Sequence, residues 1–416
     1  MSIKINQSTV YGTVNAPPSK SMTHRYLITS ALAEGTSTLS HPLKSDDTIT
    51  TVIALRNLGI QISEEGKNWV IDGGSLNSPN LIIDCKESGT TLRFITGVCS
   101  LIDKPCTLTG SPSLLRRPNG PLLRALEQLG VETQSQDGYP PITVKGKLVG
   151  GKAQIRGDVS SQFISSIILV APYSEEPVEL KILKLESKPY VQMTLDAMRN
   201  CGINTQHSHS FDMINVPIGR YHPVDTWIEG DWSSAAFILG AGVLSGKVHV
   251  DFLNIQSSQA DKKILRILDE LGGYLKIKGN RVTTEKSSLT SIEANLSDCP
   301  DIFPIVSCLC SVAKGKSKLT GLGRLKIKES DRLVAMVKGL KKMGIKTSIE
   351  GTSIIIEGGK PRGAVIDPHN DHRIAMSFAI LGLTASGVTT VMNPECVSKS
   401  YPMFWDDLKR LRARID

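Results

Sequence analysis

Basic side chains gather at the predicted starts of helices along this chain. Ten of them fall at such a start or within about two turns of it. A helix N-terminus already has free N–H groups and a partial positive charge, so basic side chains normally favour the other end. One such residue alone could be a solvated surface side chain, but ten together indicate bound negative charge. They are Lys20, Arg25, Arg93, Arg116, Arg117, Lys188, Lys328, Arg332, Arg373 and Lys399.

Four carboxylates stand among these basic residues at the same helix starts. For Asp47 and Asp371 we expect the role of an N-cap, which is the commonest one for a carboxylate in that position. Asp301 and Glu329 are candidates for a general base and a general acid. If both face a cationic site, their surroundings can move their two pKa values apart, as acid–base chemistry requires.

The overall charge is consistent with a small anionic substrate. The 416-residue chain has a net charge of +8 and a pI near 9.0, which favours an acidic partner. Proteins that bind nucleic acids usually interleave a basic stripe with aromatic residues, whereas aromatic residues make up only 5% of this chain. We therefore expect small polyanionic substrates and no nucleic acid.

The predicted helix starts recur with a period of 71 residues, and this period determines the architecture. Starts in one series lie 71 residues apart every time, and three of the six are prolines, which are favoured in a first helical turn. A second series precedes it and leads into apolar segments. The first series is Asp47, Pro118, Pro189, Ala260, Asp331 and Pro402; the second is Lys20-Ser21, Ser88-Gly89, Ser160-Ser161, Ser233-Ser234, Pro300-Asp301 and His369-Asn370-Asp371.

Strands and helix ends repeat as well. Short β-branched stretches between the two helices are predicted strands, and a glycine C-cap closes the later helix of five repeats. Six copies make an α/β chain in which helices cover sheets. Three copies can enclose one core, so we expect two domains. The ligand site should lie in the cleft between them. The predicted strands include 36–39, 106–109, 178–182, 247–250 and 388–391, and the glycines are Gly59, Gly130, Gly202, Gly272 and Gly344.

The remaining composition indicates a cytoplasmic protein. The start of the chain has no signal-peptide or transit-peptide pattern, and the longest apolar run, 163–172, is too short to cross a bilayer. The eight cysteines are scattered without zinc-ligand spacing. We interpret them as small buried hydrophobic residues and expect neither a metal nor a membrane partner.

Motifs that follow one another along the whole chain are Pro18-Ser-Lys20-Ser21 with Arg25, Ser88-Gly89-Thr90 with Arg93, Arg117-Pro118, Ser160-Ser161-Gln162, Ser187-Lys-Pro-Tyr190, Lys328-Glu329-Ser-Asp-Arg332, Asp371-His-Arg373 and Lys399. Together they resemble the EPSP synthase family of enolpyruvyl transferases. The resemblance implies an inside-out α/β barrel type of fold, with a domain of residues 15–227 and a second of residues 1–14 plus 228–416. Each domain would have pseudo-threefold symmetry, and the two would close on the substrates.

The resemblance also implies a reaction, namely transfer of the enolpyruvyl group of phosphoenolpyruvate to the 5-hydroxyl of shikimate 3-phosphate in the shikimate pathway to chorismate and the aromatic amino acids. Asp301 would take the hydroxyl proton, and Glu329 or Lys20 would protonate the methylene carbon. No cofactor is implied, and we expect a monomer. By the same resemblance shikimate 3-phosphate would be held by Lys20, Ser21, Arg25, Ser160, Ser161, Gln162, Ser187, Asp301 and Lys328, and phosphoenolpyruvate by Lys20, Gly89, Arg117, Gln162, Arg332, Arg373 and Lys399.

Two positions depart from the family pattern. Glu87 stands where bacterial members commonly have asparagine, and Arg324 stands where many also have asparagine. Glu87 puts the affinity for phosphoenolpyruvate in doubt. Arg324 could contact the 3-phosphate or be a solvated surface arginine. Because Gly89 matches the family, we expect competitive inhibition by glyphosate, weakened by Glu87.

Three other functions remain open at this point. An enolpyruvyl transferase acting on UDP-N-acetylglucosamine would have the same architecture, but it carries a reactive cysteine in a loop of its second repeat. The corresponding segment here, 110–116, has no cysteine, and Cys106 lies in the predicted strand before it, where we expect a buried inert thiol. An RNA 3'-phosphate cyclase-like enzyme or a passive scaffold would have interchangeable helix starts, whereas here each repeat places different chemistry there.

Overall fold

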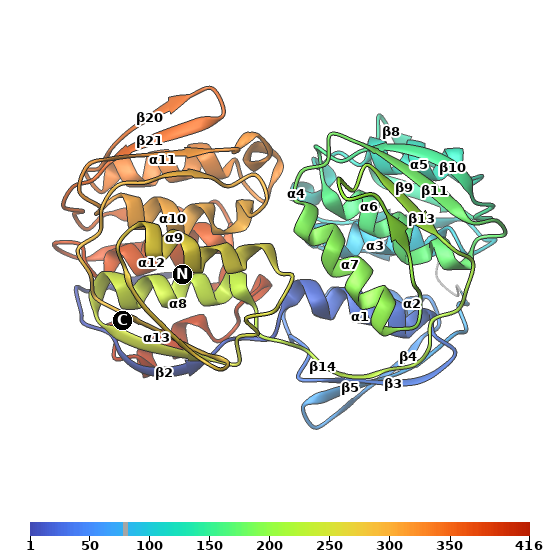
Figure 1. Cartoon of the computed structure of the whole chain (residues 1–416), viewed down its shortest axis with the longest axis horizontal. Coiled ribbons are helices and arrows are strands. Elements are labelled where there is room, and N and C mark those ends of the chain that lie inside the picture. Colours follow the sequence, from blue (N-terminus) through green and yellow to red (C-terminus); the bar gives the residue numbers. More distant parts are fainter. Residues whose placement is uncertain (78–81) are drawn as a thin grey trace. The chain divides into compact units, whose positions relative to one another are not determined.

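A computed structural model of the chain describes residues 1–77 and 82–416. Its backbone divides into two compact units, which Figure 1 shows coloured along the sequence. We call residues 18–228 the N-terminal unit, and residues 1–17 with 229–416 the C-terminal unit. Each is described by itself.

The N-terminal unit contains three sheets with the same topology among its described residues. In each, the first strand pairs parallel with the second, and the other pairs are antiparallel. The sheet orders are β14-β3-β5-β4, β6-β7-β9-β8 and β10-β11-β13-β12. The strands are β3 (Gly35–Ser40), β4 (Gln61–Glu65), β5 (Asn68–Gly73), β6 (Ile82–Asp84), β7 (Cys106–Thr109), β8 (Glu132–Gln136), β9 (Tyr139–Lys145), β10 (Gly151–Arg156), β11 (Val178–Leu183), β12 (Gln206–His207), β13 (Met213–Val216) and β14 (Asp225–Trp227).

The C-terminal unit repeats this topology and uses the start of the chain to complete it. Its sheets have the orders β2-β15-β17-β16 and β18-β19-β21-β20, and a three-stranded sheet has the order β22-β23-β1. β2 pairs parallel with β15, and β1 pairs antiparallel with β23. The strands are β1 (Ser2–Ile5), β2 (Tyr11–Asn15), β15 (Lys247–Asp251), β16 (Tyr274–Lys278), β17 (Arg281–Glu285), β18 (Glu293–Asn295), β19 (Lys316–Thr320), β20 (Lys346–Glu350), β21 (Ser353–Glu357), β22 (Val365–Ile366) and β23 (Thr389–Met392).

Each repeat contributes two main helices, and their starts lie close to the predicted ones. One inner helix per repeat is buried along nearly its whole length, and the second helix buries one face. The inner helices are α1 (Lys20–Leu32), α3 (Gly89–Cys99), α6 (Ser161–Val170), α8 (Trp232–Ser245), α10 (Phe303–Cys310, preceded by η3, Pro300–Ile302) and α12 (His372–Gly382); the second helices are α2 (Asp46–Asn57), α5 (Gly120–Gln128), α7 (Lys188–Asn200), α9 (Ile264–Glu270, preceded by η2, Ala260–Lys263), α11 (Arg332–Lys342) and α13 (Phe404–Arg410). Shorter helical segments are α4 (Pro112–Leu115), η1 (Ala171–Tyr173), η4 (Gly323–Ile327) and η5 (Pro394–Lys399).

The glycine C-caps predicted at the ends of the second helices are confirmed. In five repeats the residue after the C-cap is a glycine in the left-handed region, with φ between 78 and 93°. This conformation is costly for residues with a Cβ atom. The sixth repeat is different, because after α13 the corresponding residue is Arg412, with φ of 67°.

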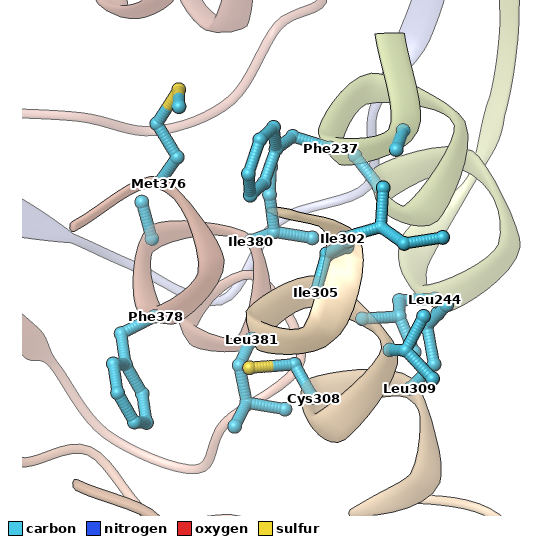
Figure 2. Close-up of a cluster of buried hydrophobic side chains, with 14 of the residues drawn as sticks. Phe237, Leu244, Ile302, Ile305, Cys308, Leu309, Met376, Phe378, Ile380 and Leu381 are labelled. Atoms are coloured by element: carbon cyan, nitrogen blue, oxygen red, sulfur yellow. The ribbon is translucent and has the colours of Figure 1, made fainter. Parts of the chain in front are cut away.

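The core of each unit lies among its inner helices. In the C-terminal unit, Phe237 of α8, Ile305 of α10 and Phe378 of α12 belong to one buried apolar cluster, part of which Figure 2 shows. Helices that are apolar on all sides must be buried, whereas strands that alternate buried and exposed residues have one open face. Both patterns are observed, since α12 is buried along its length while β21 alternates. No helix in the described ranges has the length and apolar character needed to span a bilayer.

Candidate functional site

The start of α1 brings a lysine against a carboxylate of α2. Lys20 is the first residue of α1, and its Nζ lies 2.8 Å from Oδ2 of Asp47. The expectation that Asp47 is an N-cap is wrong, because Ser45 caps α2 in a reciprocal capping box with Thr48. This leaves the Asp47 carboxylate available to pair with Lys20.

Arg25, one turn into α1, is buried among neutral partners. Its guanidinium donates to Oγ1 of Thr194 at 2.8 Å, to the Ser21 carbonyl at 2.9 Å and to the Tyr190 carbonyl at 2.7 Å. Burial lowers the pKa of Arg25 to about 10, which keeps it charged at neutral pH. A buried positive charge held by neutral oxygens is costly unless an anion also binds.

A second arginine links α3 to α6. Arg93 donates to Oε1 of Gln162 at 2.5 Å and to Oδ1 of Asn119 at 3.3 Å. Nε2 of Gln162 in turn donates to Oγ1 of Thr90 at 2.8 Å. Both ends of the Gln162 amide are thereby fixed.

Gly89 and Arg117 approach each other closely. A Cβ atom at position 89 would lie 2.9 Å from Nη1 of Arg117, so glycine leaves room for the guanidinium. Arg117 is 8% exposed, and within the described ranges its Nε has no hydrogen-bond partner. A buried guanidinium with unused donors beside a helix start is suited to a bound anion.

Three serines predicted for the site also lie at helix starts of the N-terminal unit. Ser160 caps α6 by accepting from the backbone N–H of Gln162 at 3.3 Å, and Ser161 is the first residue of the helix. Ser187 occupies the N-cap position of α7 with φ of 57°. Lys188 and Arg116 are exposed and are therefore better explained as solvated side chains. We call Lys20, Ser21, Arg25, Gly89, Arg93, Arg117, Ser160, Ser161, Gln162 and Ser187 the N-terminal cation cluster.

In the C-terminal unit, Arg332 binds three carboxylates. Its side chain is 1% exposed, and its Nε lies 2.7 Å from Asp371, its Nη1 2.6 Å from Asp301 and its Nη2 2.6 Å from Glu329. Burial alone would lower the pKa of Arg332, but these three charges raise it well above its ordinary value. Arg332 therefore stays protonated and fixes both of the predicted acid–base residues.

Asp301 lies at the start of the η3–α10 segment between several cations. Its carboxylate is 3.4 Å from Nζ of Lys328 and 3.3 Å from Nη2 of Arg373. Burial would raise the pKa of Asp301, but Arg373, Lys328 and Arg332 outweigh it and hold this pKa well below its ordinary value. Burial lowers the pKa of Lys328, and the charge of Asp301 partly opposes this.

The remaining predicted residues of this unit are also buried or half-buried. Asp371 is the N-cap of α12 as expected, and it accepts from the backbone N–H of Arg373 at 3.0 Å. Lys399 is 8% exposed and donates to the Asn370 carbonyl at 2.7 Å. Arg324 is 8% exposed and donates to the Ser297 carbonyl at 2.5 Å, so the solvated-surface interpretation is wrong. We call Asp301, Lys328, Glu329, Arg332, Asp371, Arg373 and Lys399 the C-terminal charge cluster.

Sequence reasoning missed Asp261, a buried carboxylate beside this cluster. Ser233 donates to it, and burial followed by the charge of Asp301 raises its pKa. The 71-residue period could have identified Asp261. It occupies the position directly after a predicted start of the first series, and in other repeats that position contains residues that bond to the site residues described above. Along the chain the residues at this position are Thr48, Asn119, Tyr190, Asp261, Arg332 and Met403.

The cysteines are buried as predicted, and none of the eight is in a disulfide. Cys106 lies in β7, and burial raises the pKa of Cys310 and of Cys396 to about 12. Thiols of this kind are poor nucleophiles. Over the described ranges, no group of three histidine, cysteine or acidic side chains is arranged to hold a metal ion.

The fold is that of the enolpyruvyl transferases. The EPSP synthase of Acinetobacter baumannii superposes with a TM-score of 0.84 at 27% identity, covering 100% of this chain and 99% of that chain. The enolpyruvyl transferase NikO from Streptomyces tendae superposes with a TM-score of 0.83 at 17% identity, covering 100% of this chain and 98% of that chain, and shows the shared fold alone.

The sequence narrows this class to one family. The family model described as EPSP synthase (3-phosphoshikimate 1-carboxyvinyltransferase) matches residues 5–408. The 3-phosphoshikimate 1-carboxyvinyltransferase of Methanocaldococcus jannaschii is 40% identical over 97% of this chain and 96% of its own length. That of Methanocorpusculum labreanum is 38% identical over 99% of both. The chain belongs to the EPSP synthase family.

Proposed function

We propose that this chain transfers the enolpyruvyl group of phosphoenolpyruvate to the 5-hydroxyl of shikimate 3-phosphate, with release of phosphate. As a member of its family the chain is a 3-phosphoshikimate 1-carboxyvinyltransferase of the shikimate pathway. At the level of residues, the observation that carries the proposal is the presence of buried cations at helix starts. Both units place buried cations there, as two anionic substrates require.

The two units, residues 18–228 and residues 1–17 plus 229–416, would be the two domains that the sequence predicts at residues 15–227 and residues 1–14 plus 228–416, with the active site between them. Shikimate 3-phosphate would be held by Lys20, Ser21, Arg25, Ser160, Ser161, Gln162 and Ser187, joined by Asp301 and Lys328. Phosphoenolpyruvate would be held by Arg332, Arg373 and Lys399 together with Lys20, Gly89, Arg117 and Gln162. Closure of the domains would exclude water and strengthen these interactions.

The reaction would proceed by addition and then elimination. Asp301 accepts the proton of the 5-hydroxyl, whose oxygen bonds to C2 of phosphoenolpyruvate, while Glu329 or Lys20 protonates the methylene carbon. The tetrahedral adduct then loses a proton from the new methyl group as its C–O bond to phosphate breaks. The arginines stabilise the phosphate in every state, because bidentate charge-assisted hydrogen bonds suit its oxygens.

The cations around Asp301 limit its ability to act as the base in this scheme. A carboxylate held by three cations is a weak base, because its pKa is far below the ordinary value. When phosphoenolpyruvate binds, its anionic groups compete with Asp301 for Arg332 and Arg373. Asp301 would then regain basicity in the complex in which it is needed. We further propose that the enzyme is a cytoplasmic monomer that needs no cofactor.

The test is release of phosphate from phosphoenolpyruvate by the purified chain. Release should require shikimate 3-phosphate and yield 5-enolpyruvylshikimate 3-phosphate in equal amount. UDP-N-acetylglucosamine is the parallel acceptor and should give no release. Turnover with the sugar nucleotide alone would contradict the proposal.

A further inference from the structure

A basic pocket lies in the C-terminal unit at the opposite ends of the inner helices from the charge cluster. Its volume is about 450 Å³, within the range of small-molecule sites. The ends of α8 and α12 border it through Ser245 and Thr384. Because α12 begins at His372 and ends at Gly382, the pocket is a helix length away from Arg373.

Three cationic side chains line this pocket. They are Lys286, Arg412 and Arg414, and of the described residues lining it none is acidic. Among neighbouring carboxylates, Glu285 pairs with Lys247 at 2.7 Å, and Asp416 accepts from the neutral amide of Asn6 at 3.1 Å. The pocket therefore has a positive charge that its own walls do not neutralise.

These cations are not needed to cap the helices beside them. The carbonyl of Gly242 near the end of α8 accepts from the backbone N–H of Gly246, and that of Val243 accepts from the backbone N–H of Ser287. After α12, the carbonyl of Leu383 accepts from the backbone N–H of Ser8. Backbone donors thus satisfy groups that basic side chains often satisfy at helix ends.

The conformation of Arg412 is the second observation. It adopts a left-handed conformation at the position where the other five repeats have glycine. A Cβ atom is unfavourable there, so retaining arginine has a cost that folding alone does not require. Its guanidinium lies over the ring of Tyr11, 5.6 Å from the centroid, which helps to hold the side chain in place.

From this arrangement we propose that the pocket is a second anion site, distinct from the catalytic one, for a small molecule with more than one phosphate group. Arginine and lysine supply the charge, and the hydroxyls of Thr9 and Thr384 supply further donors. The site lies wholly within the C-terminal unit, so it does not depend on the placement of the domains.

Equilibrium dialysis with labelled pyrophosphate tests this proposal. Pyrophosphate can also occupy the proposed catalytic site, so the additional equivalent bound in the pocket is the quantity to compare. Arg412→Gly and Lys286→Gln should lose this additional equivalent or bind it about tenfold more weakly than the wild type. The matched control is Lys276→Gln, which removes an exposed cation of β16 outside the pocket and should bind like the wild type.

Two further measurements separate a lost site from a damaged fold. Arg412→Gly places the residue of the other repeats at this turn, so its melting temperature should equal or exceed that of the wild type. Its kcat with saturating substrates should stay unchanged. Equal pyrophosphate binding by Arg412→Gly and the wild type would overturn the proposal, and equally tight binding of succinate at this site would overturn its preference for phosphate.

Discussion

The arginines of the two clusters have opposite kinds of partner. In the N-terminal cation cluster, Arg25 and Arg93 donate mainly to hydroxyl, carbonyl and amide oxygens, and Arg117 has an unused donor. In the C-terminal charge cluster, Arg332 and Arg373 are paired with carboxylates. The first arrangement leaves positive charge available for a ligand. In the second, the positive charge is neutralised by carboxylates, which can also exchange protons.

This difference separates binding from chemistry. Neutral partners fix a guanidinium without cancelling its charge, which suits capture of a phosphate. Carboxylate partners cancel the charge and couple the pKa values of the groups involved, which suits a site where proton transfer must wait for a substrate. Substitutions in the two clusters should therefore fail in different ways.

The largest effect should follow from Arg332→Met. Removing this guanidinium leaves Asp301, Glu329 and Asp371 without their common partner, so the free energy of unfolding should fall by about 3–5 kcal/mol. Urea unfolding followed by circular dichroism measures this. Arg266→Met is the control, because it breaks an exposed pair with Glu270 and should cost less than about 1 kcal/mol.

The same substitution has a defined pH dependence. The pKa of Asp301 is depressed in the folded state, so its ion pairs stabilise the wild type above the unfolded value of about 4 and lose this effect as the pH falls further. The difference between wild type and Arg332→Met should therefore be largest at neutral pH and shrink below about pH 4. A difference that grows in acid would contradict the charge arrangement described above.

Next in size is Asp301→Asn, which should lower kcat by about 10²-fold or more, because an amide cannot accept the hydroxyl proton. Binding of shikimate 3-phosphate, measured by calorimetry, should persist. Asp298→Asn, three residues earlier and before η3, is the control and should retain nearly full activity. A wild-type kcat for Asp301→Asn would exclude it as the base.

Arg117→Gln should affect binding and leave stability nearly unchanged. Its guanidinium has an unused donor and no carboxylate partner in the described ranges, so its loss strands no buried charge. The KM for phosphoenolpyruvate should rise by about tenfold or more, as expected for loss of a charge-assisted hydrogen bond. Arg116→Gln, the exposed neighbour, should behave like the wild type, and a large loss of stability in Arg117→Gln would break the comparison between the clusters.

The smallest effect is expected for Glu87→Gln. Glu87 lies two residues before Gly89, where its charge opposes an incoming anion. The KM for phosphoenolpyruvate and the inhibition constant for competitive glyphosate should each fall by about two- to threefold at low salt. Asp84→Asn serves as the control, because this carboxylate already pairs with Lys86 at 2.6 Å. If glyphosate does not inhibit at millimolar concentration, the expectation for Gly89 is wrong.

Much of the fold followed from local patterns in the sequence. The starts of α1, α3 and α6 and the five glycine C-caps depend on residues within one or two turns, so periodicity identified them. The start of α8 was placed slightly late because Asp231, rather than a serine, caps it. Local chemistry cannot choose between two capping residues that lie two positions apart when both suit the start of a helix.

The ion pairs within the clusters could not be predicted from the sequence. Glu329 and Arg332 are close in the chain, but Asp301 reaches Arg332 from the inner helix of the same repeat, and Asp371 reaches it from the next repeat. The position of Asp47 at a helix start favours a cap, whereas its observed partner, Lys20, lies 27 residues away on another helix. Which charge meets which depends on the packing of helices, and that information lies in no single segment.

The use of the chain's first residues as strands also has a consequence for its synthesis. Residues 1–17 are synthesised before the rest of the C-terminal unit, yet β2 must wait for β15 and β1 for β23, while Lys4 and Asn6 bond to Asp416 and Arg414. The N-terminal unit can close its first sheet as soon as β14 emerges. A nascent chain thus carries unpaired strand edges for most of its translation, a state in which strands of different chains can pair and aggregate.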